Sequence, residues 1–235
     1  MNLLALDTSS IACTVALQLG IDVTERYAEK PREHTRLLLP MIEELLAGAP
    51  ADLRALDAIV LGNGPGSFIG LRIAVSVAQG LAYGAGLAVA PVSSLAAVAA
   101  RVFATSEAER VAVAQDAHRS EVYFGVFERG IGDLPVAVGP ERLHGIGAID
   151  VLRDFDTGGV LAAGIGWQRY PGLLAANRDF LDGLADARFP RGRDLLPLGA
   201  AALAEGAAVE ARSLSPAYLR DRVAAAPDDA RGDLG

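Results

Sequence analysis

The side chains best suited to chemistry begin with a short polar turn near the start of the chain. Asp7, Thr8 and Ser9 follow directly after an apolar run at residues 3–6. Hydroxyl and backbone N–H groups in such a turn can bind a phosphate, and a carboxylate beside them can hold its metal ion. The turn is therefore a candidate nucleotide or phosphate loop. The alternative is a turn that only closes a hairpin, in which the polar side chains bond their own backbone.

A glycine-rich loop at residues 62–72, with the sequence GNGPGSFIGLR, is the second candidate. Gly64, Gly66 and Ser67 could bring backbone N–H groups close to a phosphate at the end of a strand. The loop lacks the Lys-Ser or Lys-Thr of a Walker A motif and the spacing of a Rossmann motif. Arg72 at its end either neutralises a ligand or has a structural role, pairing with a carboxylate on the protein surface.

The helix expected after this loop has a regular pattern of small residues. Ser67 is a typical N-cap residue, so the helix is expected over residues 68–83, with Gly84 and Gly86 as its stop signal. Small residues four apart form a smooth stripe, and larger apolar residues form a ridge beside it. The stripe consists of Gly70, Ala74, Ala78 and Ala82, and the ridge consists of Ile73, Val77 and Leu81. Such a surface lets another backbone approach closely, and that neighbour is either the chain's own sheet or another subunit.

The sequence offers little other catalytic equipment. None of His34, His118 and His144 has a second histidine three to five residues away. Cys13 is the single cysteine, which excludes an internal disulfide and a cysteine cluster for zinc. No G-x-S-x-G motif is present to place a nucleophilic serine. We therefore expect no metal site and no intrinsic cofactor.

The layout of the first strands is repeated in the second half of the chain. An apolar run at residues 111–114 leads to a turn with Asp116, and a second apolar run follows at 121–127. The two aspartates stand about a hundred residues apart, a spacing typical of two similar lobes. Asp116, Arg119 and Glu121 either line a cleft between the lobes or belong to a solvated turn, with structural roles for Asp116 and Glu121.

Alternating strands and helices predict an α/β fold with a mixed sheet in each lobe. We expect one lobe over residues 1–104, a second over 105–220 whose last helix packs back on the first, and a flexible tail over 221–235. Pro40 lies inside the first predicted helix, so that helix either starts late or kinks. The expected strands are 3–6, 13–19, 23–27, 58–61, 87–90, 111–114, 121–127, 136–138 and 160–163. The expected helices are 37–46, 68–83, 95–104, 146–155 and 196–208.

Composition limits the class of protein. Over 235 residues, 51% of them hydrophobic and 21% charged, the chain is long and apolar enough to bury a core. A net charge of −8 argues against binding nucleic acid without a partner. The N-terminus has no basic region ahead of its apolar run, and charges or Gly and Pro interrupt the Ala-rich runs. We expect a cytoplasmic protein that has no membrane segment.

Several motifs together resemble one known family. LALDTS at residues 4–9 with CTVA at 13–16 is similar to the opening of the actin/sugar-kinase/Hsp70 superfamily. REHT at 32–35, GNGPGSFIGLRI at 62–73 and AQGLA at 78–82 resemble the bacterial TsaB (YeaZ) family of tRNA threonylcarbamoyladenosine biosynthesis proteins. The similarity continues through Asp116-Ala117, EVY at 121–123, GIGW at 164–167 and PAYLR at 216–220. Asn63, Ile69 and His118 depart from the family pattern.

The resemblance implies two actin-like, ribonuclease H-like lobes and a role in forming threonylcarbamoyladenosine (t6A) beside the anticodon of tRNA. It further implies a non-catalytic subunit that binds the catalytic paralogue TsaD, with the ATPase TsaE completing the complex and ATP or ADP at a shared interface. In the family the partner surface is the helix after the glycine loop, here with Gly70, Ile73, Ala74, Val77, Ala78 and Leu81. The same surface serves self-association, so a homodimer is expected when the chain is free. The alternative is a kinase-like, ATP-dependent phosphotransferase using Asp7 and Thr8.

Overall fold

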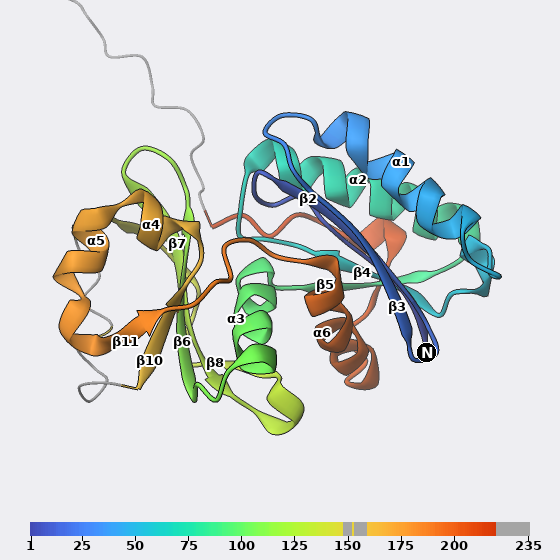
Figure 1. Ribbon diagram of the computed structural model, residues 1–235. Helices are drawn as coiled ribbons and strands as arrows, with labels where there is room; N and C mark the ends of the chain where they lie inside the picture. Colours follow the sequence, from blue (N-terminus) through green and yellow to red (C-terminus); the bar gives the residue numbers. More distant parts are fainter. Residues whose placement is uncertain (148–151, 153–158, 220–235) are drawn as a thin grey trace, which may run out of the picture.

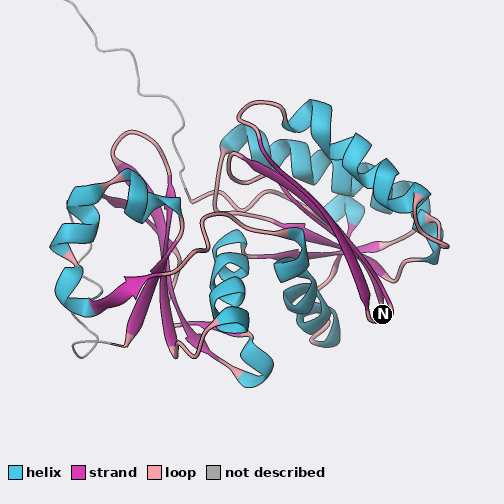
Figure 2. Ribbon diagram, viewed as in Figure 1, coloured by secondary structure: helices cyan, strands magenta, loops and turns pink. Residues whose placement is uncertain are grey.

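The structure is a computed structural model that describes residues 1–147, 152 and 159–219. Two mixed β-sheets lie side by side, each with packed helices (Figures 1 and 2). The predicted fold class, α/β with two actin-like lobes, is confirmed. The boundaries at residues 104 and 220 remain predictions, and the tail at 221–235 lies outside the described residues.

The first sheet has the strand order β12-β5-β4-β1-β2-β3. β1 pairs antiparallel with β2 and parallel with β4, so the sheet is mixed. Its strands are β1 (Asn2–Asp7), β2 (Ala12–Leu19), β3 (Asp22–Glu29), β4 (Ala58–Gly62), β5 (Ala88–Val92) and β12 (Val209–Glu210). The turn at Asp7 and the glycine loop both follow strand ends at the same edge of this sheet, which brings them together.

The second sheet repeats this plan, with the order β11-β10-β6-β7-β8 and β9 paired to β7. Its central strand β6 pairs antiparallel with β7 and parallel with β10, as β1 pairs with β2 and β4. Its strands are β6 (Arg110–Asp116), β7 (Glu121–Arg129), β8 (Pro135–Ala137), β9 (Arg142–Gly145), β10 (Val160–Ala163) and β11 (Leu181–Leu184). The repetition predicted from the two Asp-bearing turns is therefore present in the strand pairing.

Helices cover both faces of the first sheet. α1 (His34–Ala47) and α2 (Phe68–Ala85) lie on one face, where they pack with Leu4 and Leu6 of β1. α6 (Gly192–Ala204) lies on the other face, where it packs with Leu3 and Ala5. This division follows from the strand period of two, which points successive side chains to opposite faces.

Helix α3 (Ser94–Thr105) lies between the sheets, beside α6 (Figure 1). Most of its buried side chains pack with the second sheet, and Ala97 packs with Leu3 and α6. α3 therefore belongs to both cores.

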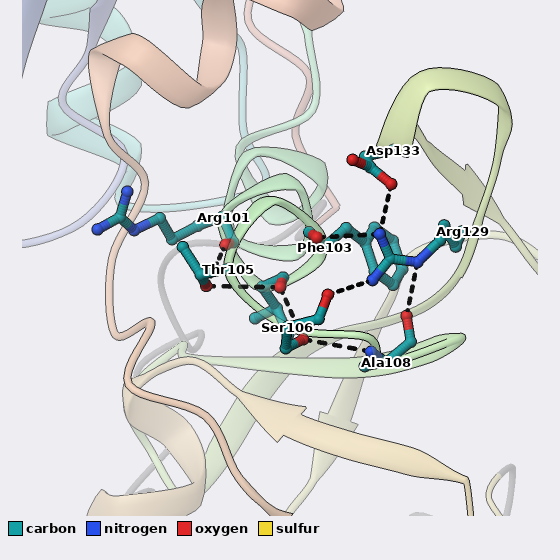
Figure 3. A network of polar contacts seen from close by, with 8 residues as sticks. Arg101, Phe103, Thr105, Ser106, Ala108, Arg129 and Asp133 are labelled. Carbon is teal, nitrogen blue, oxygen red and sulfur yellow. Dashed lines mark hydrogen bonds and ion pairs between the residues drawn. The ribbon is translucent and has the colours of Figure 1, made fainter.

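Arg129, at the end of β7, fixes the C-terminal end of α3 to the second sheet (Figure 3). Its Nη1, Nη2 and Nε groups donate to the backbone oxygens of Phe103, Ser106 and Ala108 at 3.0, 2.6 and 3.0 Å. Nη1 also pairs with the Asp133 carboxylate, and the guanidinium lies 5.0 Å from the centre of the Phe103 ring. One side chain thus satisfies carbonyl groups that a helix end leaves without a partner.

Several short elements were missing from the predictions, and two helices differ from them. The missed elements include β9, β11, β12, α4 (Ile165–Arg169) and α5 (Pro171–Ala176). α1 begins at His34 and continues through Pro40, so the late start is wrong. α6 covers Gly192–Ala204, not 196–208, because Gly192 packs directly on β2 and its N–H donates to Thr14 Oγ1 at 2.8 Å. The helix predicted at 146–155 falls mostly on residues outside the described ones.

One described helix, α2, is long and apolar enough to cross a membrane by length and composition alone. Within this fold its Leu71, Ala74 and Ala78 side chains are buried in the core formed with the first sheet. The apolar composition of α2 is thus accounted for partly by that core.

Candidate functional site

The polar turn after β1 is buried and bonded internally. The Asp7 side chain is 1% exposed, and its Oδ1 accepts hydrogen bonds from the Ser9 N–H and hydroxyl, both at 2.7 Å. Its Oδ2 accepts from the Ser94 hydroxyl at 2.6 Å. Burial raises the pKa of the Asp7 carboxyl, and the hydrogen bonds from Ser94 and Ser9 oppose that rise.

The glycine loop closes directly over this turn. The Thr8 hydroxyl donates to the Gly70 oxygen at 2.7 Å, and the Ser67 N–H donates to the Ser9 oxygen at 2.7 Å. A Cβ atom on Gly70 would lie 1.9 Å from the Thr8 oxygen, so only glycine allows this approach. Two hydrogen bonds join Gly64 to Ser94. The Ser94 hydroxyl oxygen accepts the Gly64 N–H at 3.0 Å, and the Ser94 N–H donates to the Gly64 oxygen at 2.7 Å.

These contacts do not fit the predicted phosphate loop. Asp7, Thr8 and Ser9 are buried, and their polar groups are engaged by Ser67, Gly70 and Ser94 instead of facing a ligand. Gly64 and Gly66 serve close backbone packing in the same cluster. Among the described residues, no group of three His, Cys, Asp or Glu side chains could hold a metal ion. The internal hydrogen bonds are those expected for the hairpin-closing alternative, and a phosphate-binding role for this turn stays a prediction.

The smooth stripe on α2 faces the chain's own core. Ala74 and Ala78 are 0% exposed, and Gly70 is buried against Thr8. These three residues therefore cannot lie at a surface that a partner reaches in the folded chain, and this part of the interface prediction is corrected. Ile73, Val77 and Leu81 are half-buried at the border of that core, and their place at an interface remains a prediction.

The opposite face of α2 carries a second stripe of small residues, which the sequence reading missed. Ser76, Gly80 and Gly84 are exposed and again four residues apart. A Cβ atom on Gly80 or Gly84 would meet nothing within 4 Å. Large exposed apolar side chains border this stripe, namely Ile69 at 70% and Tyr83 at 85%. We call this surface the outer face of α2.

A groove of about 420 Å³ runs between α1 and the outer face of α2. Its apolar lining comes from both helices and consists of Leu38, Leu39, Phe68, Ile69, Ile73 and Val77. His34, Thr35, Arg72 and Ser76 supply its polar groups. His34 is 8% exposed, and its Nε2 atom has no hydrogen-bond partner among the described residues.

A C-terminal segment that follows α6 returns to this side of the first sheet. The Asn63 amide donates to the Ser215 oxygen at 3.0 Å, and the Gln79 amide donates to the Ala211 and Leu214 oxygens at 3.1 and 3.0 Å. Arg72 Nε donates to the Tyr218 hydroxyl at 2.9 Å. Arg72 thus has a structural contact, although with a hydroxyl instead of the expected carboxylate.

The matching turn of the second lobe differs from the Asp7 turn. The Asp116 carboxylate accepts from the His118 N–H at 2.9 Å and from the Tyr170 hydroxyl at 2.7 Å, and it pairs with Arg169 at 3.0 Å. It therefore links the end of β6 to α4. Glu121 begins β7, and its backbone closes the turn through the Ala117 N–H at 3.0 Å.

Comparisons with known proteins place the chain in a family. A family model described as TsaD: tRNA N6-adenosine threonylcarbamoyltransferase matches residues 27–144. The Escherichia coli K12 tRNA threonylcarbamoyladenosine biosynthesis protein TsaB is 37% identical over 231 residues, covering 95% of this chain and 96% of that protein. The chain belongs to the TsaB family. The TsaB of Haemophilus influenzae Rd is 36% identical and covers 95% of each chain.

Solved structures agree with the TsaB assignment. YeaZ from Pseudomonas aeruginosa superposes with a TM-score of 0.81 at 38% identity, covering 93% of this chain and 99% of that one. A P. aeruginosa protein described as similar to peptidase YeaZ gives a TM-score of 0.84 at 39% identity with the same coverage. The resemblance read from the glycine-loop motif is confirmed.

Proposed function

We propose that this TsaB-family chain is a non-catalytic subunit that supports threonylcarbamoyl transfer to tRNA by binding the catalytic paralogue TsaD. The relatives at 36% and 37% identity are named for threonylcarbamoyladenosine biosynthesis, and they match this chain over nearly its whole length. The similarity to the TsaD family model supports a paralogue of that transferase as the partner.

The observation that carries this proposal is the outer face of α2. Gly80 lies at an exposed position in the interior of α2, where a glycine lowers helix stability by about 1 kcal/mol relative to alanine, and Gly84 lies exposed in the last turn of the helix. A Cβ atom on either glycine would meet nothing within 4 Å outside the backbone of its own helix. Small residues at this spacing allow the backbone of a second helix to approach closely, and Ile69 and Tyr83 supply exposed apolar area at the same place.

The buried turn supports a non-catalytic role. A phosphotransferase that used Asp7 would need its carboxylate to reach a metal ion or a hydroxyl, but that carboxylate is 1% exposed and bonded to Ser9 and Ser94. The kinase-like alternative therefore gains no support from this site. We propose that any ATP or ADP in the assembly lies at an interface between subunits.

The same proposal covers TsaE, self-association of the chain, its location in the cell and its relation to tRNA. We propose that TsaE joins the complex, that the free chain forms a homodimer through the outer face of α2, and that the chain works in the cytoplasm. With a net charge of −8, the chain itself is not expected to bind tRNA, so a partner would supply the basic surface.

The direct test measures binding to TsaD and product formation together. Gly80→Leu fills the exposed stripe and is expected to weaken TsaD binding at least about a hundredfold, because a side chain in a closely packed helix crossing forces the backbones apart. Product should fall in parallel in a reconstituted reaction with TsaD, TsaE, tRNA and the threonylcarbamoyl-adenylate donor.

The matched control makes the same change at another exposed glycine. Gly172 lies in α5 of the second lobe, and a Cβ atom there would also meet nothing within 4 Å. Gly172→Leu therefore adds the same side chain to an exposed helix position outside the outer face of α2. It should leave both TsaD binding and product formation unchanged.

Two results would overturn the proposal. The first is full-strength TsaD binding by a folded Gly80→Leu variant, which would move the interface elsewhere. The second is normal t6A formation by TsaD and TsaE when this chain is omitted, which would remove the supporting role itself.

A further inference from the structure

The groove between α1 and α2 is lined mostly by apolar side chains, and its described lining also holds hydrogen-bond donors but no acid. None of the residues lining it in the described chain is Asp or Glu, whereas the chain as a whole carries a net charge of −8. Arg72 and His34 supply its basic groups, and Thr35 and Ser76 add two hydroxyls. The groove is therefore complementary in charge to an acidic group flanked by apolar surface.

Arg72 is held in place at the edge of this groove. Its guanidinium lies 3.9 Å from the centre of the Phe68 ring, and its Nε donates to the Tyr218 hydroxyl at 2.9 Å. The Tyr218 ring in turn lies 5.1 Å from the Phe68 ring, centre to centre. Arg72 takes part in no ion pair among the described residues, so its two terminal nitrogens have no carboxylate partner there.

His34 lines the same groove and holds one buried polar atom without a hydrogen-bond partner in the described chain. It is 8% exposed, lines the groove, and its Nε2 atom makes no hydrogen bond within the part of the chain that the structure describes. A buried polar atom left without a partner is costly, and most such atoms in native proteins are satisfied. Nε2 is itself buried, however, so a side chain docked in the groove does not contact it, and His34 also acts electrostatically on the buried Asp7 carboxyl.

We propose that Arg72 forms a site for a carboxylate side chain of TsaD, in a segment whose apolar residues fill the groove. Phe68 and Tyr218 are positioning residues, because they hold the guanidinium at the groove edge and leave its terminal nitrogens available for a two-point contact with a carboxylate. This inference rests on the proposed function and names the chemistry that selects the partner. The C-terminal segment, through Tyr218, thereby contributes to a surface formed by α1 and α2.

The test measures the dissociation constant of the TsaD complex for a set of variants at low and high salt. Arg72→Gln should weaken binding about tenfold to a hundredfold at low salt and reduce the salt dependence of the affinity. Tyr218→Phe keeps the ring on Phe68 but removes the hydroxyl, and should weaken binding less, by about threefold to tenfold. Arg54→Gln, at an exposed arginine outside the groove, is the matched control.

A second arm identifies the partner group. Each acidic residue on the surface helices of TsaD is changed to its amide, and each change is combined with Arg72→Gln. One TsaD residue should show strong non-additivity with Arg72, meaning that the double variant binds no worse than either single one.

Two results would overturn the inference. One is TsaD binding within about twofold of the parent by Arg72→Gln, and the other is a TsaD with no acid that couples to Arg72. Gly80→Leu separates the two proposals. Loss of binding in Gly80→Leu with normal binding in Arg72→Gln rejects the carboxylate site and keeps the docking face.

Discussion

The two faces of α2 carry the same sequence pattern and have opposite surroundings. The inner stripe, Gly70 with Ala74 and Ala78, is small because the chain's own backbone and sheet lie against it. The outer stripe, Ser76 with Gly80 and Gly84, is just as small, although a Cβ atom on either glycine would meet nothing within 4 Å. On the inner face small residues stabilise this fold, and on the outer face the glycines lower the stability of the isolated chain.

That difference shows which residues are informative about a partner. A small residue that the fold requires says nothing about binding, because its reason lies within the chain. Where the fold does not require a small residue, its presence needs another explanation. Close approach by a second protein is one such explanation. Substitutions that change one face of α2 at a time test this contrast.

The largest effect is expected for Gly70→Ala. The added Cβ would lie 1.9 Å from the Thr8 oxygen, which is backbone and cannot turn away, so we expect a loss of about 3 kcal/mol or more in the free energy of unfolding. Urea unfolding followed by circular dichroism measures it. A variant as stable as the parent would show that the glycine loop and the Asp7 turn are not packed together in this way.

A charge placed on each face gives a matched pair. Ala78→Glu buries a carboxylate at a position that is 0% exposed and should cost about 3 kcal/mol or more, or prevent folding. Ser76→Glu, two residues away on the exposed face, should change stability by less than about 0.5 kcal/mol. The same unfolding measurement serves both variants, and TsaD binding should be lost in Ser76→Glu. Equal destabilisation by the two changes would contradict the assignment of the faces.

The start of α2 offers a smaller effect. Ser67 Oγ accepts the Gly70 N–H at 3.3 Å as the N-cap contact, so Ser67→Ala should lower stability by about 1 kcal/mol. Ser67→Asp keeps an acceptor at the cap and should retain most of the stability, which thermal melting of both variants would measure. If Ser67→Asp is as unstable as Ser67→Ala, the cap contact is not the reason for serine here.

The smallest expected effect is a rise in the free energy of unfolding instead of a fall. Gly80→Ala and Gly84→Ala should each raise the free energy of unfolding by about 0.5 to 1 kcal/mol, because alanine favours the helix and the space beside it is empty. Both should weaken TsaD binding, so stability and affinity move in opposite directions. Gly86→Ala is the control, since Gly86 has a φ of 71° and alanine is strained there. Lower stability in Gly80→Ala would show an internal reason for that glycine.

Much of the fold follows from local patterns. The buried strands, the N-cap Ser67 and Gly86 as the stop of α2 were predicted from the sequence, because each depends on residues close together in the chain. Gly84, the other half of the predicted stop signal, lies inside α2, which continues to Ala85. The start of α6 was misplaced by about one helical turn, because it is set by Gly192 packing on β2, a contact across most of the chain. The groove was missed for the same reason, since His34, Arg72 and Tyr218 come together only in the folded protein.

The sequence by itself determined the family, the α/β class, the repeated strand layout and the position of α2. Spacing along a helix fixes which residues share a face, and motifs carry their identity in any context. Only the tertiary structure decided which face of α2 is covered, that Asp7 is bonded to Ser9 and Ser94, and that Arg72 is held at a groove by Tyr218. Burial depends on which elements pack against each other, and a helical period cannot tell an inward stripe from an outward one when both are made of small residues.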